Sequence, residues 1–265
     1  MQEHSIRSPH PQAVGPLVGS TVLVTGASRG IGRAIALAVA HAGADVALTF
    51  RSNETGARTV AREIECLERN AYVYQTDISV PDSITALATR ARADLGTIDV
   101  WVNNAGADVL TGSAATLSTL EKLDLLIAVD LRGSIYASWT AAQLMLEQPR
   151  GGVIINVSWD HAVSGMKGKN PELFAAVKGG VLSFSKSLAR SVAPKVRVNV
   201  LAPGWIETAF GAELDEAKYQ RVADSTPLKR WGTPDDVAGA AVFLASPSAA
   251  FLTGHTLLVN GGVVM

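Results

Sequence analysis

The chain has 265 residues, of which 48% are hydrophobic and 18% charged, and its formal net charge at pH 7 is −1. This size and composition fit one large domain with a well-filled core, and the balanced charge, without a Lys/Arg-rich block, gives no reason to expect nucleic acid or a membrane surface as a partner. Cys66 is the only cysteine, so an intrachain disulfide and a thiolate zinc site are excluded, and a reducing, cytoplasmic location is expected.

The first 18 residues differ in character from the rest of the chain. They are polar, contain three prolines and lack the apolar core of a signal peptide, and no later apolar run reaches membrane-spanning length without interruption. The sequence therefore predicts a loose tail over residues 1–18 and a single folded domain over residues 19–265.

From residue 21 onward, short β-branched runs alternate with longer helical stretches, which is typical of βαβ units and a parallel sheet. The apolar runs show little polar alternation, as expected of strands buried on both faces, and predict strands at 21–25, 45–50, 71–75, 98–102, 153–157, 196–201 and 256–259. Helices are predicted between them at 31–42, 54–69, 82–95, 117–147, 171–193, 214–222 and 235–245. Right-handed crossovers then give an α/β Rossmann fold, a doubly wound seven-stranded parallel sheet with helices on both faces.

A glycine-rich loop follows the first predicted strand and opens the first helix, with the sequence Thr25-Gly26-Ala27-Ser28-Arg29-Gly30-Ile31-Gly32. Glycines there permit a tight turn, let the backbone approach a pyrophosphate and leave helix N–H groups pointing at that anion. A glycine trio alone is also compatible with a flexible turn. Its place between strand and helix favours dinucleotide binding, with contacts from Gly26, Ser28, Arg29, Gly30, Ile31 and Gly32.

Further motifs follow in a fixed order, namely Asp77-Ile78, Asn103-Asn104-Ala105-Gly106, Pro203-Gly204-Trp205-Ile206-Glu207-Thr208, Pro227 through Ala238, Phe243-Leu244-Ala245-Ser246, Thr253-Gly254 and Asn260-Gly261-Gly262. With these motifs the chain resembles, over residues 19–262, the short-chain dehydrogenase/reductase family, especially its 3-oxoacyl-acyl-carrier-protein reductase-like members. The resemblance implies that Asp77 and Ile78 contact the adenine, that Asn104, Ala105 and Gly106 line the cofactor cleft, and that the nicotinamide amide is held by Pro203, Gly204, Ile206 and Thr208. It also implies a homotetramer or homodimer.

The end of the second predicted strand indicates which dinucleotide is bound. An acidic residue there would bind ribose hydroxyls and repel a 2′-phosphate, but this chain has Phe50 followed by Arg51 and Ser52. Arg51 and Arg29 of the glycine loop can both donate charge-assisted hydrogen bonds to a phosphate. Although a surface arginine is often merely solvated, the pair favours NADP(H), and no metal is expected.

The resemblance also implies a catalytic tetrad, and most of it is replaced here. The family has a tyrosine four residues before a lysine that binds the nicotinamide ribose, and this chain has Phe174 before Lys178. The register set by Asn156 puts Trp159 at the position of the family's serine, and the asparagine position falls on Asp130. Only Lys178 remains of the four.

A one-residue shift in the register would restore Ser158, because alternate strand residues face opposite sides of a sheet. No shift restores the tyrosine, since Tyr72, Tyr74, Tyr136 and Tyr219 all lie far from Lys178 in sequence.

A substitute proton donor is suggested by the segment after the fifth predicted strand, at an edge of the sheet where ligands bind in such folds. An imidazole is an effective proton donor at physiological pH, so His161 can act as an acid directly or through water, with Asp160 or Asp130 as acid or orienting group. The alternative is a surface histidine in a loop, with Asp160 capping a turn.

Two functions follow from this sequence. The first is an NADP(H)-dependent oxidoreductase that reduces a carbonyl or polarised double bond of a small molecule with a non-standard proton donor, residues 205–222 forming a lid that selects the substrate. The second is a catalytically silent NADPH-binding scaffold or sensor, which the three replaced tetrad positions favour.

Overall fold

Seven parallel strands lie side by side in the order β3-β2-β1-β4-β5-β6-β7. The computed structural model describes residues 15–208, 211 and 214–265. The strands are β1 (Thr21–Val24), β2 (Asp45–Phe50), β3 (Ala71–Gln75), β4 (Val100–Asn103), β5 (Gly152–Val157), β6 (Val196–Pro203) and β7 (Thr256–Val259). The predicted Rossmann-type sheet is confirmed, and each predicted strand end lies within two residues of the observed one.

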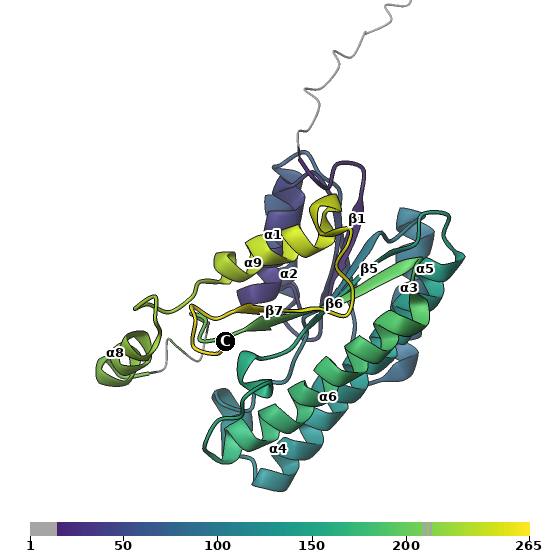
Figure 1. Cartoon of the computed structure of the whole chain (residues 1–265). Helices are drawn as coiled ribbons and strands as arrows, with labels where there is room; N and C mark the ends of the chain where they lie inside the picture. Colours follow the sequence, from purple (N-terminus) through teal and green to yellow (C-terminus); the bar gives the residue numbers. More distant parts are fainter. Residues whose placement is uncertain (1–14, 209–210, 212–213) are drawn as a thin grey trace, which may run out of the picture.

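Helices cover both faces of the sheet, because the strands carry apolar side chains on both faces. One hydrophobic cluster joins the sheet to α1 (Gly30–His41), α2 (Glu54–Glu65) and α9 (Pro234–Ala245). The other joins its opposite face to α3 (Pro81–Leu95), α5 (Ser134–Glu147) and α6 (Lys169–Val192). Figure 1 shows α1 and α9 side by side and α6 running along the other face.

The prediction of one regular helix over residues 117–147 is wrong. Its first part, α4 (Thr119–Leu126), starts at a capping box between Ser118 and Glu121, and it runs into the π-helical segment η2 (Ile127–Gly133) before α5 begins. A 3₁₀ turn, η1 (Gly112–Thr116), precedes it. π-Helical insertions are rare and occur mostly near functional sites, and this one contains Asp130.

The remaining elements are short. They are α8 (Glu216–Ser225), which begins two residues later than predicted, and the 3₁₀ turns η3 (Asp160–Ala162) and η4 (Pro247–Ala249). Residues 209–210 and 212–213 of the predicted lid lie outside the described residues.

The packed chain begins just before the boundary predicted at residue 18. Leu17 is 2% exposed in the α1 side of the core, and its N–H donates to the Ala42 carbonyl oxygen at 2.9 Å. Residues 1–14 of the predicted tail lie outside the described residues. In the part of the chain that the structure describes, no helix has the length and apolar character needed to cross a membrane.

A buried polar network ties the centre of the sheet to α5 and α6. Asn103 Nδ2 donates to Asn156 Oδ1 at 2.8 Å and to Ser138 Oγ at 3.0 Å. Asn103 Oδ1 accepts from the indole of Trp101 at 2.8 Å, and Asn156 Nδ2 donates to Ser185 Oγ at 2.8 Å. These side chains are buried, so their mutual hydrogen bonds replace those they lose to water.

Candidate functional site

A cavity of about 1150 Å³ lies at the carboxyl ends of the strands, where ligands bind in open α/β sheets. Its wall includes every residue that the sequence assigns to the cofactor, namely Gly26, Ser28, Arg29, Gly30, Ile31, Gly32, Arg51, Ser52, Asp77, Ile78, Asn104, Ala105, Gly106, Lys178, Pro203, Gly204, Ile206 and Thr208. Loops that are far apart in the sequence therefore converge on one site.

The glycine loop fits a dinucleotide pyrophosphate. A Cβ on Gly32 would lie 2.3 Å from the Gly26 carbonyl oxygen and 2.4 Å from Asn104 Nδ2, so only glycine is accommodated there. Helix α1 begins after Arg29 without a side-chain cap, which leaves its first N–H groups available to an anion. The amide of Asn104 donates to the carbonyl oxygens of Thr25 and Gly26 at 3.0 and 3.2 Å and so holds the loop in place.

The end of the cavity beyond β2 and β3 carries the groups suited to an adenosine moiety. Asp77 accepts hydrogen bonds from the N–H and hydroxyl of Ser79 at 2.9 and 2.6 Å. Burial opposes ionisation of Asp77, but these hydrogen bonds and the charge of Arg51 hold its pKa below the ordinary value. The Asp77 carboxylate is therefore ionised and fixed, and Arg51 lies close enough to influence it.

The opposite end of the cavity contains an ion pair between Lys178 and Asp130. Lys178 Nζ lies 2.8 Å from Asp130 Oδ1 and donates to the Val157 carbonyl oxygen at 3.3 Å. Asp130 is 1% exposed, and its Oδ2 accepts the Ala107 N–H at 2.8 Å. A Cβ on Gly106 would lie 2.9 Å from Asp130 Oδ1, so the loop after β4 closes tightly over this carboxylate. The π-helical turn and α6 thus meet at one compensated charge pair.

Ser158, Trp159 and Phe174 lie beside this pair, at the positions where the sequence predicts replacement of the family's serine and tyrosine. Ser158 Oγ donates to the Lys178 carbonyl oxygen at 2.8 Å, which commits its proton to helix α6. Trp159 and Phe174 both line the cavity, and their ring centroids are 6.2 Å apart. Phe174 also packs against the small cluster of Val109, Leu126 and Val177. No tyrosine lies in the described cavity wall.

Two predicted site residues, His161 and Asp160, are not among the residues that line the described cavity, although His161 contacts Trp159 and Trp205, which do, so their catalytic role stays a prediction. Asp160 is 0% exposed and accepts from the His161 N–H at 2.7 Å and from Asn260 Nδ2 at 3.2 Å. Nδ1 of His161 lies 2.8 Å from the same carboxylate, and the imidazole stacks on Trp159 at 5.0 Å. The 3₁₀ turn η3 carries both residues, and it directs Asp160 toward Asn260 and His161 toward Trp159 and Trp205.

Four aromatic side chains that line the cavity form a surface that we call the aromatic wall, comprising Trp159, Phe174, Trp205 and Trp231. Sequence reasoning placed Trp205 within the predicted lid and assigned no role to Trp231, although both lie in motifs that it singled out. The imidazole of His161 bridges Trp159 and Trp205, with centroids 5.0 and 6.4 Å away, and Trp205 contacts Trp231 at 5.6 Å. The wall is therefore continuous from α6 to the segment before α9.

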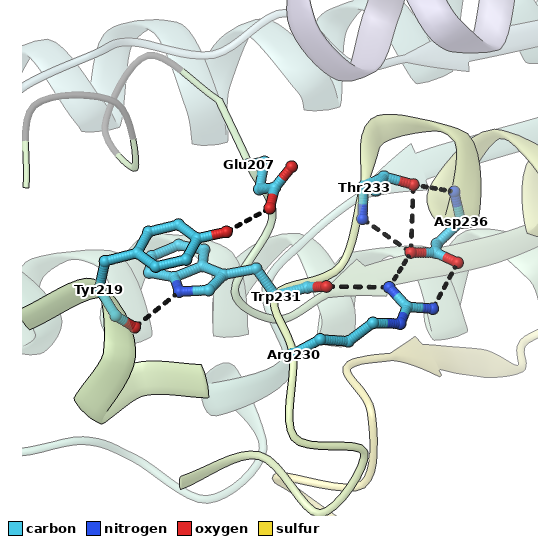
Figure 2. A network of polar contacts seen from close by, with 6 residues as sticks. All are labelled: Glu207, Tyr219, Arg230, Trp231, Thr233 and Asp236. Carbon is cyan, nitrogen blue, oxygen red and sulfur yellow. Dashed lines mark hydrogen bonds and ion pairs between the residues drawn. The ribbon is translucent and has the colours of Figure 1, made fainter. Parts of the chain in front are cut away.

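Polar contacts from α8 and α9 fix the Trp231 end of the aromatic wall (Figure 2). Trp231 is 2% exposed, its indole N–H donates to the Tyr219 carbonyl oxygen at 3.0 Å, and its ring stacks on that of Tyr219 at 5.1 Å. The Tyr219 hydroxyl donates to Glu207, a further cavity residue, and the neighbouring carboxylate raises the pKa of the tyrosine. Arg230 donates to the Trp231 carbonyl oxygen and to both Asp236 oxygens.

The described residues contain no group of three or more His, Cys, Asp or Glu side chains placed to hold a metal ion.

Comparisons with known proteins find relatives along most of the chain. The family model described as "Enoyl-(Acyl carrier protein) reductase" matches residues 26–264. The chain is 37% identical over 252 residues to the 3beta-hydroxysteroid dehydrogenase 1 of Eggerthella lenta, which covers 94% of this chain and 95% of the relative. It is 36% identical to a 3-oxoacyl-[acyl-carrier-protein] reductase of Synechocystis over 94% of this chain and 98% of the relative.

Among solved structures, a short chain dehydrogenase from Burkholderia cenocepacia in complex with NADP matches with a TM-score of 0.85 and 32% identity, covering 94% of this chain and 99% of that one. The dinucleotide cleft, the sheet order and these matches lead to one conclusion: the chain belongs to the short-chain dehydrogenase/reductase family of nicotinamide-dependent oxidoreductases.

Proposed function

We propose that this protein is an NADP(H)-dependent oxidoreductase that reduces a carbonyl or polarised double bond of a small molecule at a site where the usual hydroxyl groups are replaced. The observation that carries the proposal is one cavity that joins a complete dinucleotide cleft to the Lys178–Asp130 pair. When bound, NADPH supplies a hydride, and the chain supplies the binding and orientation that bring an acceptor to it.

Positive charge in the cavity wall favours NADP(H) over NAD(H). Arg29 and Arg51 line the cavity in the loops after β1 and β2, and Phe50 occupies the place where a carboxylate would repel a 2′-phosphate. A guanidinium presents paired donors that match phosphate oxygens. The solved relative from Burkholderia cenocepacia, with NADP bound, adds support.

Lys178 has two roles in this proposal. It binds the nicotinamide ribose, as the family resemblance implies, and when the acceptor is a carbonyl its ammonium is the side chain that can supply the proton. Of the cationic side chains in the described cavity wall, Arg29 and Arg51 serve the phosphate end. Lys178 is left for the opposite end, where the acceptor would meet the nicotinamide and which we call the reacting end. Asp130 holds that ammonium in place at 2.8 Å.

The proposal is tested by following NADPH oxidation with a panel of ketones, quinones and enoyl thioesters and by measuring NADPH affinity calorimetrically. We expect turnover with at least one acceptor class, and we expect Lys178→Met to weaken NADPH binding by roughly tenfold, the value of one or two lost hydrogen bonds. Lys186→Met, on the exposed side of the same helix, is the matched control. Tight NADPH binding with no oxidation of any acceptor would instead identify a silent cofactor-binding protein.

We also infer a homotetramer or homodimer. Helices α5 and α6 expose neighbouring aromatic rings, with Trp139 and Phe184 centroids 5.9 Å apart and Trp139 52% exposed. Exposed apolar patches of this kind mark protein contacts. Sedimentation of the protein and of Trp139→Glu measures the assembly directly, and a wild-type monomer would refute the inference.

A further inference from the structure

We infer that the acceptor is a planar ring cation with a C=N⁺ double bond, an iminium, rather than a neutral carbonyl; this inference rests on the hydride transfer proposed above. Three observations at the reacting end of the cavity support it: the loss of hydroxyl donors, the compensation of the lysine charge, and an aromatic wall flanked by carboxylates.

The first observation concerns proton supply. A ketone becomes an alcohol only if its oxygen receives a proton, but Phe174 has no hydroxyl and the Ser158 hydroxyl is committed to the Lys178 carbonyl oxygen at 2.8 Å. That leaves the Lys178 ammonium as the donor, and it is itself held by Asp130 at 2.8 Å. An iminium needs no proton. Its carbon accepts a hydride from bound NADPH, the C=N π electrons become the nitrogen lone pair, and the products are a neutral amine and NADP⁺. A reacting end without the family's phenol and free alcohol is therefore complete for this reaction.

The second observation concerns charge. An unpaired ammonium at Lys178 would repel a cationic acceptor, and a neutral asparagine, as in the family, would leave that charge uncompensated. Here Asp130 lies 2.8 Å from Lys178 Nζ and cancels its charge within the pair. The reacting end thereby accepts a cation, because the family's asparagine has been replaced by a carboxylate.

A further carboxylate, Glu207, lies in the wall of the same cavity, whereas the Asp108 carboxylate, also in the wall, lies near the charge of Arg29. Glu207 is exposed and accepts from the Tyr219 hydroxyl, and the nearby Arg230, which is within reach of its charge, is already paired with Asp236. Negative charge here attracts a cation and repels acids, phosphates and anionic thioesters. During the transfer the positive charge moves from the acceptor nitrogen to the nicotinamide, so the same carboxylates stabilise it throughout.

The third observation concerns shape. Aromatic faces attract cations, tryptophan most strongly, and Trp159 and Trp205 are the partly exposed tryptophans of the aromatic wall, with Trp231 buried against Tyr219. The wall is preorganised, because Trp231 is fixed by Tyr219 and Trp159 is stacked on His161. Flat rings complement such a wall better than flexible acyl chains do. A cyclic or bicyclic iminium therefore fits both the charge and the shape of the cavity.

Turnover is measured with two acceptors of similar size, N-methyl-dihydroisoquinolinium and tetralone, and rates are corrected for uncatalysed reduction. We expect the iminium to be reduced with at least a tenfold higher kcat/KM than the ketone. Reduction of tetralone in preference to the iminium would overturn this inference and leave the proposed oxidoreductase intact. Reduction of neither, by a protein that binds NADPH, would overturn both.

A binding measurement provides a readout that does not depend on catalysis. With the protein saturated by NADP⁺, titration of N-methylisoquinolinium and its neutral analogue methylnaphthalene is followed by tryptophan fluorescence or calorimetry. We expect Glu207→Gln, which keeps an acceptor for Tyr219, to weaken the cation about five- to tenfold and the neutral analogue less than twofold. We expect Trp159→Leu to weaken the cation roughly 10- to 30-fold. Glu65→Gln, at an exposed position on α2, is the charge-matched control. Equal effects of Glu207→Gln on both ligands would overturn the assignment of a cationic substrate.

Discussion

The carboxylate of Asp130 is shared between two partners, Lys178 Nζ at 2.8 Å from Oδ1 and the Ala107 N–H at 2.8 Å from Oδ2. It stands in the π-helical turn η2, and Lys178 stands in the middle of α6. A buried lysine with a dedicated carboxylate is costly to leave unpaired, because the desolvation penalty of the remaining charge is no longer offset.

Asp130→Asn therefore destabilises the protein. Asparagine still accepts the Ala107 N–H but leaves the Lys178 ammonium uncompensated, and we expect the free energy of unfolding to fall by roughly 1–3 kcal/mol, less than for a fully enclosed pair because the cavity admits water. Urea denaturation measures the change, with Asp124→Asn on exposed α4 as the control. An unchanged denaturation midpoint would mean that the pair contributes nothing to stability.

Arg51→Asp reduces the preference for NADPH. The substitution removes a guanidinium donor and adds a charge that repels a 2′-phosphate, so the ratio of NADH to NADPH dissociation constants is expected to fall roughly 10- to 100-fold. Calorimetry with both cofactors gives the ratio. Arg62→Asp on α2 carries the same charge change away from the cavity wall. Equal NADPH and NADH affinities in the wild type would refute the charge argument itself.

His161→Ala separates packing from acid catalysis. A positioned general acid contributes about 10²–10⁴-fold to turnover, and this is the loss that the sequence hypothesis predicts. The imidazole instead stacks on Trp159 and faces buried Asp160, so we expect kcat to change by less than about tenfold. The unfolding temperature and tryptophan fluorescence should change. A hundredfold loss of kcat at unchanged KM would restore His161 as the donor.

Phe174→Tyr combined with Trp159→Ser tests whether the hydroxyls that the family resemblance implies at these two positions would allow ketone reduction. Residue 174 lies one helical turn before Lys178, so the double variant returns a phenol and an alcohol to the reacting end of the cavity. Reduction of tetralone is expected to rise at least tenfold, within the range that a general acid supplies. Phe184→Tyr on the same helix, outside the cavity wall, should leave it unchanged. No gain by the double variant would show that other features of the site also exclude ketones.

Asp236→Asn lowers stability in a pH-dependent way. Hydrogen bonds from Arg230 and from the Thr233 backbone hold the pKa of Asp236 well below its ordinary value of 3.8, and the carboxylate completes the capping box of α9. Because the folded-state pKa is depressed, this stabilisation is complete above the ordinary value and is lost as pH falls below it. The wild type should exceed the variant by about 1 kcal/mol at pH 7, and the difference should shrink below about pH 4. A difference that is constant with pH would contradict the role of the charge.

The strands and the cofactor cleft follow from the sequence because each depends on local signals. Apolar runs such as residues 45–50 are long enough to define buried strands, and glycines such as Gly32 occupy positions where any Cβ would collide with the backbone. The order of the loops along the chain then determines which residues meet at the cavity.

The π-helical turn and the position of His161 do not follow from the sequence. Periodicity over residues 117–147 is compatible with an unbroken α-helix, and nothing in it signals the extra residue per turn at Asp130. Asp160 and His161 follow a strand that ends at the cavity, and only the 3₁₀ turn η3, with the contact of Asp160 to distant Asn260, sets where their side chains point. Such long-range contacts leave no local pattern.

The buried amides of Asn103 and Asn156 determine how α5 and α6 are positioned on the sheet. Apolar contacts are non-directional, so a helix packed on a sheet only by methyl groups can slide or rotate at little cost. The bonds to Ser138 and Ser185 are directional, and a displacement of α5 or α6 by one residue would break them inside a dry interior. These hydrogen bonds therefore fix the register of α5 and α6 relative to the strands. Because α6 carries Lys178 and η2, which carries Asp130, runs directly into α5, these hydrogen bonds in the core also fix where the two opposite charges meet in the cavity wall.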